Sequence, residues 1–196
     1  MFNIKKIAVI SSLSFSLFFA PTIANAATHT VQSGESLWKI ATKHGVSIQE
    51  IMQSNKLSGT IIYPGQQLQL PSNLSNEELD LMARLVNAEA KGESYAGKVA
   101  VATVVLNRVD HADFPNTIRS VIYQRSAGGY YAFTPVQNGE INHAADSEAK
   151  RAVQEALAFR GQGQGSIYFY NPRTAKSDWI LSREITITIG NHRFAK

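Results

Sequence analysis

Glu89 is the side chain of this sequence that is best placed to act as an acid catalyst. Apolar residues at helical spacing, Leu79, Met82 and Val86, predict a helix over residues 76–90 with one buried face. Glu89 follows Val86 by three positions and therefore falls on the apolar side of that helix. Partial loss of hydration raises the pKa of a carboxyl group and keeps it protonated closer to neutral pH. Such a group can protonate the leaving oxygen of a glycosidic bond. The alternative is a helix-end glutamate that only binds nearby backbone amides.

Aromatic residues near the C-terminus form a second group with binding chemistry. Tyr168 and Tyr170 alternate in the sequence just before Asn171, and Trp179 follows. Aromatic faces pack against the C–H surfaces of pyranose rings, and side-chain amides bind acetamido groups. Ordinary core packing is the alternative for each aromatic side chain. We expect at least one of them to contact a sugar.

The helix that carries the carboxyl group begins a helix-rich unit, which we assign to residues 73–196. Ser75 and Glu78 form a capping box at its start. Two further helices are expected after Ser94 and Asp146, and the first of them is apolar nearly all round, which is typical of a buried central helix. The remaining predicted segments are a short helix over 117–124, an irregular stretch over 126–143, and strands over 166–170 and 184–189.

A smaller unit precedes it, over residues 27–72. Its pattern predicts a strand, two short helices and a closing strand. Ser36 is placed to cap the first helix, and Gly45 to end it. Together the two units predict an α+β protein with a small βααβ module followed by a helix-rich domain that has a small β element.

The smaller unit resembles a LysM module along its whole length. The residues that carry the resemblance are Thr30-Val31, Gly34-Glu35-Ser36-Leu37, Ile40-Ala41, Gly45-Val46, Asn55, Ile62, Pro64-Gly65-Gln66 and Leu68. The resemblance implies binding of glycans that contain N-acetylglucosamine. A module of this size binds weakly, so it serves best to concentrate an attached domain on a polymer.

The LysM resemblance also implies where the glycan binds. The groove lies between two loops, to which Gly34, Glu35 and Ser36 contribute on one side and Ile62 and Tyr63 on the other. Backbone amides there can bind acetamido groups, while apolar side chains cover the sugar face. The alternative is that these residues only shape turns.

The larger unit resembles the catalytic domain of the SleB/CwlJ family of cell-wall hydrolases, which is known for lysis of the spore cortex. The motifs that carry this resemblance are Ala83-Arg84-Leu85-Val86-Asn87-Ala88-Glu89-Ala90-Lys91-Gly92-Glu93, Gly97-Lys98-Val99-Ala100-Val101-Ala102, Leu106-Asn107-Arg108-Val109, Phe133-x-Pro-Val-x-Asn-Gly139, Tyr168-Phe169-Tyr170-Asn171-Pro172, Ser177-x-Trp179-Ile180 and Ile189-Gly190-x-His192-x-Phe194. The resemblance implies a lysozyme-like fold and lytic transglycosylase chemistry between N-acetylmuramic acid and N-acetylglucosamine, with Glu89 as the catalytic glutamate.

The number of carboxylates in the reaction stays open at this point. In a lytic transglycosylase the 6-hydroxyl of the sugar itself attacks, so one general acid suffices, whereas a muramidase-type hydrolase needs a second carboxylate. Glu93 follows Glu89 by four positions, but Gly92 interrupts the helix and leaves their geometry undefined. Other candidates for a second carboxylate are Glu140, Asp146 and Glu148.

Two other classes of protein fit less well. A peptide or amide hydrolase needs a catalytic thiol or a zinc site, but the sequence has no cysteine, and His111, His143 and His192 lack ligand-like spacing. We therefore expect no metal and no other cofactor. A non-catalytic wall or spore-coat protein is the remaining alternative, since a LysM module alone could bind peptidoglycan.

The N-terminal 26 residues predict export. Lys5 and Lys6 precede an apolar run over residues 7–20, and Ala24-Asn25-Ala26 is a small-x-small cleavage site, so the mature chain should begin at Ala27. The run is too short for a comfortable membrane span, and no stable span is expected after cleavage. The net charge of +4 comes from scattered residues, which does not suggest nucleic-acid binding. We expect a secreted protein of a Gram-positive-type cell wall, spore cortex or coat, with peptidoglycan as partner and its oligomeric state open.

Overall fold

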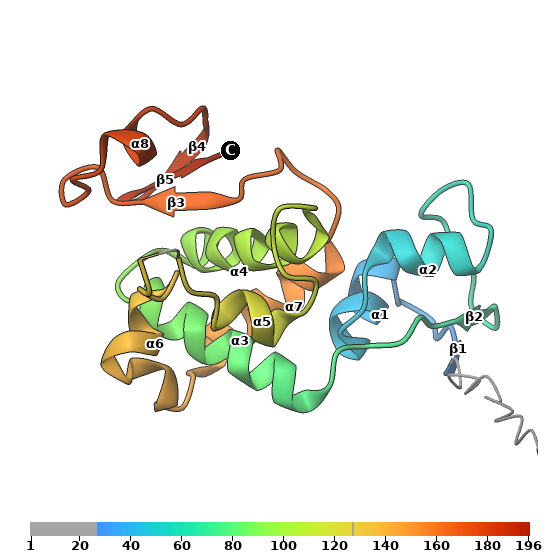
Figure 1. Ribbon diagram of the computed structural model, residues 1–196. Helices are drawn as coiled ribbons and strands as arrows, with labels where there is room; N and C mark the ends of the chain where they lie inside the picture. Colours follow the sequence, from blue (N-terminus) through green and yellow to red (C-terminus); the bar gives the residue numbers. More distant parts are fainter. Residues whose placement is uncertain (1–26, 127) are drawn as a thin grey trace, which may run out of the picture.

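The structure is a computed structural model that describes residues 27–126 and 128–196. The predicted signal peptide lies outside the described residues. Two units lie side by side, with the smaller one packed against one end of the larger helical one (Figure 1). Among residues 27–126 and 128–196, no helix is both long enough and apolar enough to span a membrane.

The smaller unit has the predicted strand–helix–helix–strand order. Its elements are β1 (Thr28–Thr30), α1 (Leu37–His44), α2 (Ile48–Ser54) and β2 (Gln67–Gln69). The two strands pair antiparallel. The Ser36 hydroxyl accepts the backbone N–H of Lys39, and Gly45 ends α1 in the left-handed conformation, with φ 63°. A capping box at Ser47 and Glu50 starts α2.

The larger unit is built around four helices that pack on a shared apolar core. These are α3 (Asn76–Glu89), α4 (Tyr95–Asp110), α5 (Ile118–Ile122) and α7 (Ser147–Ala158). The predicted caps at Ser75, Ser94 and Asp146 are present, because each accepts a backbone N–H of the following helix, and Thr117 caps α5 in the same way. The apolar face of α3 is buried at Met82 and Val86 as its spacing predicts, whereas Leu79 is only partly buried.

The stretch over 126–143 contains more structure than the sequence predicts. It holds helix α6 (Thr134–Asn138) and a 3₁₀ turn (Glu140–Asn142). Phe133 and Ile141 are buried in the main core and anchor the segment at both ends. The glycines and aromatic residues that suggested a loop therefore precede a short helix that lies against α3.

The C-terminal part forms a three-stranded antiparallel sheet. Its strands are β3 (Tyr168–Tyr170), β4 (Ile185–Ile189) and β5 (His192–Ala195), in the order β3–β5–β4. The strands β3 and β4 were expected. The strand β5 and the one-turn helix α8 (Asp178–Leu181) were not expected from the sequence pattern. The sheet lies over the α4 side of the helical core (Figure 1).

The two units share a packed interface. Ala158, at the end of α7, is fully buried within the core of the smaller unit. The hydroxyl of Ser47 donates to the carbonyl of Arg160 at 3.4 Å. The guanidinium of Arg160 in turn forms two hydrogen bonds with Asp110, at 2.6 and 3.0 Å. The smaller unit is therefore seated on the ends of α7 and α4.

Candidate active site

Glu89 is the last residue of α3, and its side chain is only partly exposed. Burial raises the pKa of Glu89 to about 7, and the backbone amide of Thr134 and the charge of Arg108 counteract only part of this effect. The carboxyl group thus lies between the end of α3, the start of α6 and helix α4. At neutral pH a large fraction of it carries a proton, which is the state a general acid requires.

The positive charge of Arg108 acts on this carboxyl group, and Arg108 is itself only 7% exposed. Its guanidinium lies 4.9 Å from the centroid of the Phe133 ring, 5.1 Å from Phe114 and 5.7 Å from Tyr168. Its Nε donates to the carbonyl of Ile167 at 2.7 Å. Burial lowers the pKa of Arg108 to about 10, so it remains charged at neutral pH.

The Arg108 guanidinium thus provides a positive charge, held in a fixed position, that acts on the Glu89 carboxyl group. The aromatic rings hold Arg108 through cation–π contacts, and the Ile167 carbonyl fixes its direction. A buried cation favours the ionised form of a nearby carboxyl group and so stabilises the anion that remains after proton donation. The site can therefore release a proton without leaving an isolated buried anion.

The structure brings Tyr168 and Trp179 together. Their rings are 5.1 Å apart at an angle of 83°, and Trp179 is 52% exposed. Because Tyr168 also lies against Arg108, this aromatic pair extends from the neighbourhood of Glu89 to the surface. Such an exposed edge-to-face pair offers an apolar face for a sugar ring.

Tyr170 and Asn171 do not belong to this exposed aromatic pair. Tyr170 is 7% exposed, and its hydroxyl is buried without a hydrogen-bond partner among the described residues. Asn171 closes the turn after β3, because its side-chain oxygen accepts the N–H of Arg173 at 2.9 Å and its carbonyl accepts that of Ala175. Both residues thus contribute to the packing and turn geometry that position Tyr168.

Glu93 is engaged with the C-terminal sheet. Its Oε1 accepts the side-chain N–H of Asn191 at 3.0 Å, and its Oε2 accepts the backbone N–H of the same residue at 3.2 Å. The turn between β4 and β5 approaches so closely that a β-carbon at Gly190 would collide with the Glu93 carboxylate. Gly190 also has a φ of 58°, which favours glycine.

Two of the three other candidate carboxylates line a cavity of about 440 Å³ beside the end of α3. Glu140 and Asp146 line it together with Lys91, His143 and Lys98. Lys98 is buried and pairs with Glu148 and Asp146. Glu148 and Glu140 thus pair with Lys98 and His143, and Asp146 caps α7. The cavity lies on the side of α3 that carries Asn87 and Ala88.

The residues predicted for the LysM groove divide into two groups. Glu35 accepts the N–H of Gln32 at 2.8 Å and contacts His29 at 2.7 Å, and these two interactions lower its pKa. Ser36 caps α1, so both side chains support local structure. Tyr63 is 68% exposed, Ile62 is partly buried, and Gly34 has a φ of 81° in its turn.

The sequence does not point to four residues of this region. Arg108 and Thr134 act on Glu89, Phe133 packs against Arg108, and Asn191 binds Glu93. The arginine gave one signal that could have been used, because it is the only charged residue between Val99 and Val109 in a helix otherwise read as buried. A charged residue in such a helix is expected to have a specific partner. The other three come from segments distant in sequence.

Comparisons with known proteins match both units. A model of the family described as Cell Wall Hydrolase matches residues 92–195, and a model of the LysM domain matches residues 29–71. Glu89 lies three residues before the first of these matches.

Several relatives are named spore cortex-lytic enzyme. The chain is 42% identical to that of Halalkalibacterium halodurans over 125 residues, which cover 64% of this chain and 36% of the relative. It is 37% identical to that of Bacillus subtilis over 127 residues, which cover 65% of this chain and 40% of the relative. The chain thus spans less than half the length of these relatives.

Solved structures match the larger unit. The crystal structure of the catalytic domain of the Bacillus cereus SleB protein is 42% identical, covers 64% of this chain and 94% of that chain, and has a TM-score of 0.57. The catalytic domain of the germination-specific lytic transglycosylase SleB from Bacillus anthracis is 41% identical, covers 65% and 100%, and has the same TM-score.

Proposed function

The chain belongs to the cell wall hydrolase family, and from this premise we propose that it is a lytic transglycosylase that cleaves the glycan strands of peptidoglycan. The bond cut joins N-acetylmuramic acid to N-acetylglucosamine, and Glu89 is the catalytic acid. The observation that carries the proposal is a carboxyl group whose burial raises its pKa to about 7 beside a fixed buried cation.

The proposed reaction uses this carboxyl group twice. Protonated Glu89 donates its proton to the glycosidic oxygen as the bond to the muramic acid C1 breaks. The 6-hydroxyl of the same sugar then attacks C1, and the Glu89 carboxylate takes up the hydroxyl proton. The products are a 1,6-anhydro end and a free 4-hydroxyl, and no water is consumed. Arg108 stabilises the intermediate carboxylate.

The bonding of Glu93 favours this single-carboxylate reaction over a muramidase-type hydrolysis. Both of its oxygens already accept hydrogen bonds from Asn191. A catalytic base must instead be available to activate water on the opposite face of the sugar. The two-carboxylate hydrolase remains the second candidate function, with Glu93 as its base or nucleophile.

The smaller unit is proposed to hold the same polymer. A LysM module with an exposed Tyr63 beside its second loop can bind N-acetylglucosamine units weakly and keep the catalytic unit near its substrate. With an exported N-terminus, the place of action is a Gram-positive-type cell wall or the spore cortex or coat. Tyr168 and Trp179 form the proposed sugar-binding face, and Asn171 shapes the turn that follows Tyr168.

Mass spectrometry of digested, purified peptidoglycan tests the reaction. Fragments with 1,6-anhydro ends are expected, 18 Da lighter than hydrolysis products because water is not added. Reducing ends would instead establish the hydrolase. If the turbidity of a peptidoglycan suspension stays constant while the chain sediments with it, the protein is a non-catalytic binder.

A further inference from the structure

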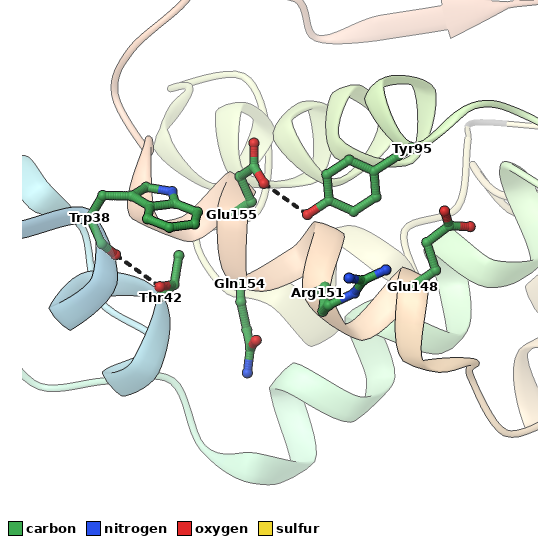
Figure 2. A pocket seen from close by; sticks show the side chains of 7 residues that line it. All are labelled: Trp38, Thr42, Tyr95, Glu148, Arg151, Gln154 and Glu155. Atoms are coloured by element: carbon green, nitrogen blue, oxygen red, sulfur yellow. Dashed lines mark hydrogen bonds between the residues drawn. The ribbon is translucent and has the colours of Figure 1, made fainter.

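A cavity of about 550 Å³ lies between the two units, away from Glu89. Figure 2 shows Trp38 and Thr42 of α1 on one side and Tyr95, Arg151 and Glu155 of the larger unit on the other. Its volume is within the roughly 300–1,000 Å³ of ordinary ligand pockets. Neither unit forms it alone.

Trp38 is the feature that the fold leaves unexplained. Helix α1 packs its own core through Leu37, Ile40 and Ala41, all of which are buried. Trp38 lies outside this face and is 43% exposed, with its indole at the border of the cavity (Figure 2). An exposed tryptophan that is not needed for the core is an apolar platform available to a ligand.

The opposite wall is polar and held in place. The hydroxyl of Tyr95 donates to Glu155 Oε2 at 2.8 Å, and the Arg151 guanidinium lies 5.8 Å from the centre of the Tyr95 ring. Glu148 is fixed by its ion pair with Lys98. Glu148, Arg151, Gln154 and Glu155 of α7 line the cavity together with Tyr95 of α4 (Figure 2).

The charges of this wall nearly cancel. Lys98 balances Glu148, and the exposed Arg151 lies one turn from Glu155 on α7. A neutral ligand therefore fits better than a charged stem peptide. An aromatic face opposite side chains that both donate and accept hydrogen bonds matches the apolar C–H surface and the hydroxyl and acetamido groups of an amino sugar.

We propose that the cavity between α1 and α7 is a glycan subsite that binds N-acetylated hexosamine units with both units of the protein at once. The choice of ligand rests on the proposed function, since peptidoglycan supplies this sugar. A strand seated there would bridge Trp38 and Arg151 and fix the smaller unit on the larger one.

Tryptophan fluorescence isolates this subsite, because the sequence holds only two tryptophans. The mature chain with Trp179→Phe and Glu89→Gln reports on Trp38 alone and does not cleave. Titration with a hexamer of N-acetylglucosamine is expected to change Trp38 emission. The pair Arg151→Ala and Gln154→Ala should weaken that response on the order of tenfold, which corresponds to about 1.4 kcal/mol.

Lys150→Ala is the matched control, because Lys150 is exposed on the same helix but does not line the cavity. Its affinity should equal that of the parent chain. The proposal is wrong if Trp38 emission stays constant, or if the Arg151/Gln154 pair binds as tightly as the control, since Trp38 would then report only the neighbouring LysM groove. Peptidoglycan cleavage by the wild type tests the proposed function separately.

Discussion

Glu93 and Asn191, which are 98 positions apart in the sequence, are joined by two hydrogen bonds that connect the start of α4 to the turn between β4 and β5. One bond comes from the side chain of Asn191 and the other from its backbone. The turn is thereby held against the helical core near the end of α3. The position of the sheet, and with it of Tyr168, depends in part on this pair.

We predict that Glu93→Ala and Asn191→Ala each lower the free energy of unfolding by about 1–2 kcal/mol, because a hydrogen bond to a charged group is lost in each case. Their combined effect should be less than the sum, since both remove the same side-chain bond. Urea unfolding measures this. Full additivity would show that the two residues are not coupled.

Glu89→Gln should abolish cleavage while the fold and wall binding are kept. Gln retains the shape of a protonated carboxyl group but has no acidic proton, and loss of general acid catalysis lowers rates by about 10²–10⁴. Release of soluble peptidoglycan fragments is the measurement. Glu93→Gln is the control and should retain clear activity with 1,6-anhydro products. An active Glu89→Gln and an inactive Glu93→Gln would reverse the assignment.

The raised pKa of Glu89 predicts how stability depends on pH. Burial favours the protonated form of Glu89. The stabilisation of the folded state by this form is fully present below the ordinary pKa of 4.5 and is lost as pH rises through the folded-state pKa of about 7. The wild type should therefore lose up to about 3 kcal/mol between pH 4.5 and 8 relative to Glu89→Gln. Thermal unfolding of both proteins across this range tests it. Parallel curves would contradict the raised pKa.

Cleavage should follow the same ionisation. The acid form of Glu89 is needed, so the rate should fall about tenfold per pH unit above a midpoint near 7. Initial rates of peptidoglycan cleavage, measured at constant ionic strength, give this profile. Replacing Arg108 with glutamine should move the midpoint upward, because the nearby positive charge lowers the pKa of Glu89.

Trp179→Ala and Tyr170→Ala should separate binding from packing. Trp179 is 52% exposed, so its loss should reduce activity with little change in melting temperature. Tyr170 is buried, and its truncation should lower stability by about 3 kcal/mol, as for other buried aromatic residues. Calorimetry and the cleavage assay on both variants give the comparison. If activity follows stability in both, Trp179 has no binding role.

The helical part of the fold was accessible from the sequence because its signals are local. Caps at Ser75, Ser94 and Asp146 and the spacing of Met82 and Val86 lie within one or two helical turns. The same spacing placed Glu89 toward the interior. Strand β5 and helix α6 were missed, because their stability comes from Phe194 and Phe133 packing into a core built by distant helices.

The surroundings of Glu89 required the structure for a related reason. Arg108 becomes a partner of the site only when Phe133, Phe114 and Tyr168 close around it, and each comes from a different segment. The spacing of residues in the sequence does not predict contacts between such distant segments. It also left the geometry of Glu93 open, since that depends on a turn near the end of the chain.

The burial of Ala158 within the smaller unit has a consequence for the order in which the protein folds. The elements from β1 to β2 are synthesised first, yet their core also includes Ala158 of α7. The Ser47–Arg160 hydrogen bond likewise joins residues 113 positions apart. We therefore expect the N-terminal module to reach its final packing only after α7 has formed, so that its docking is a late, long-range step of folding.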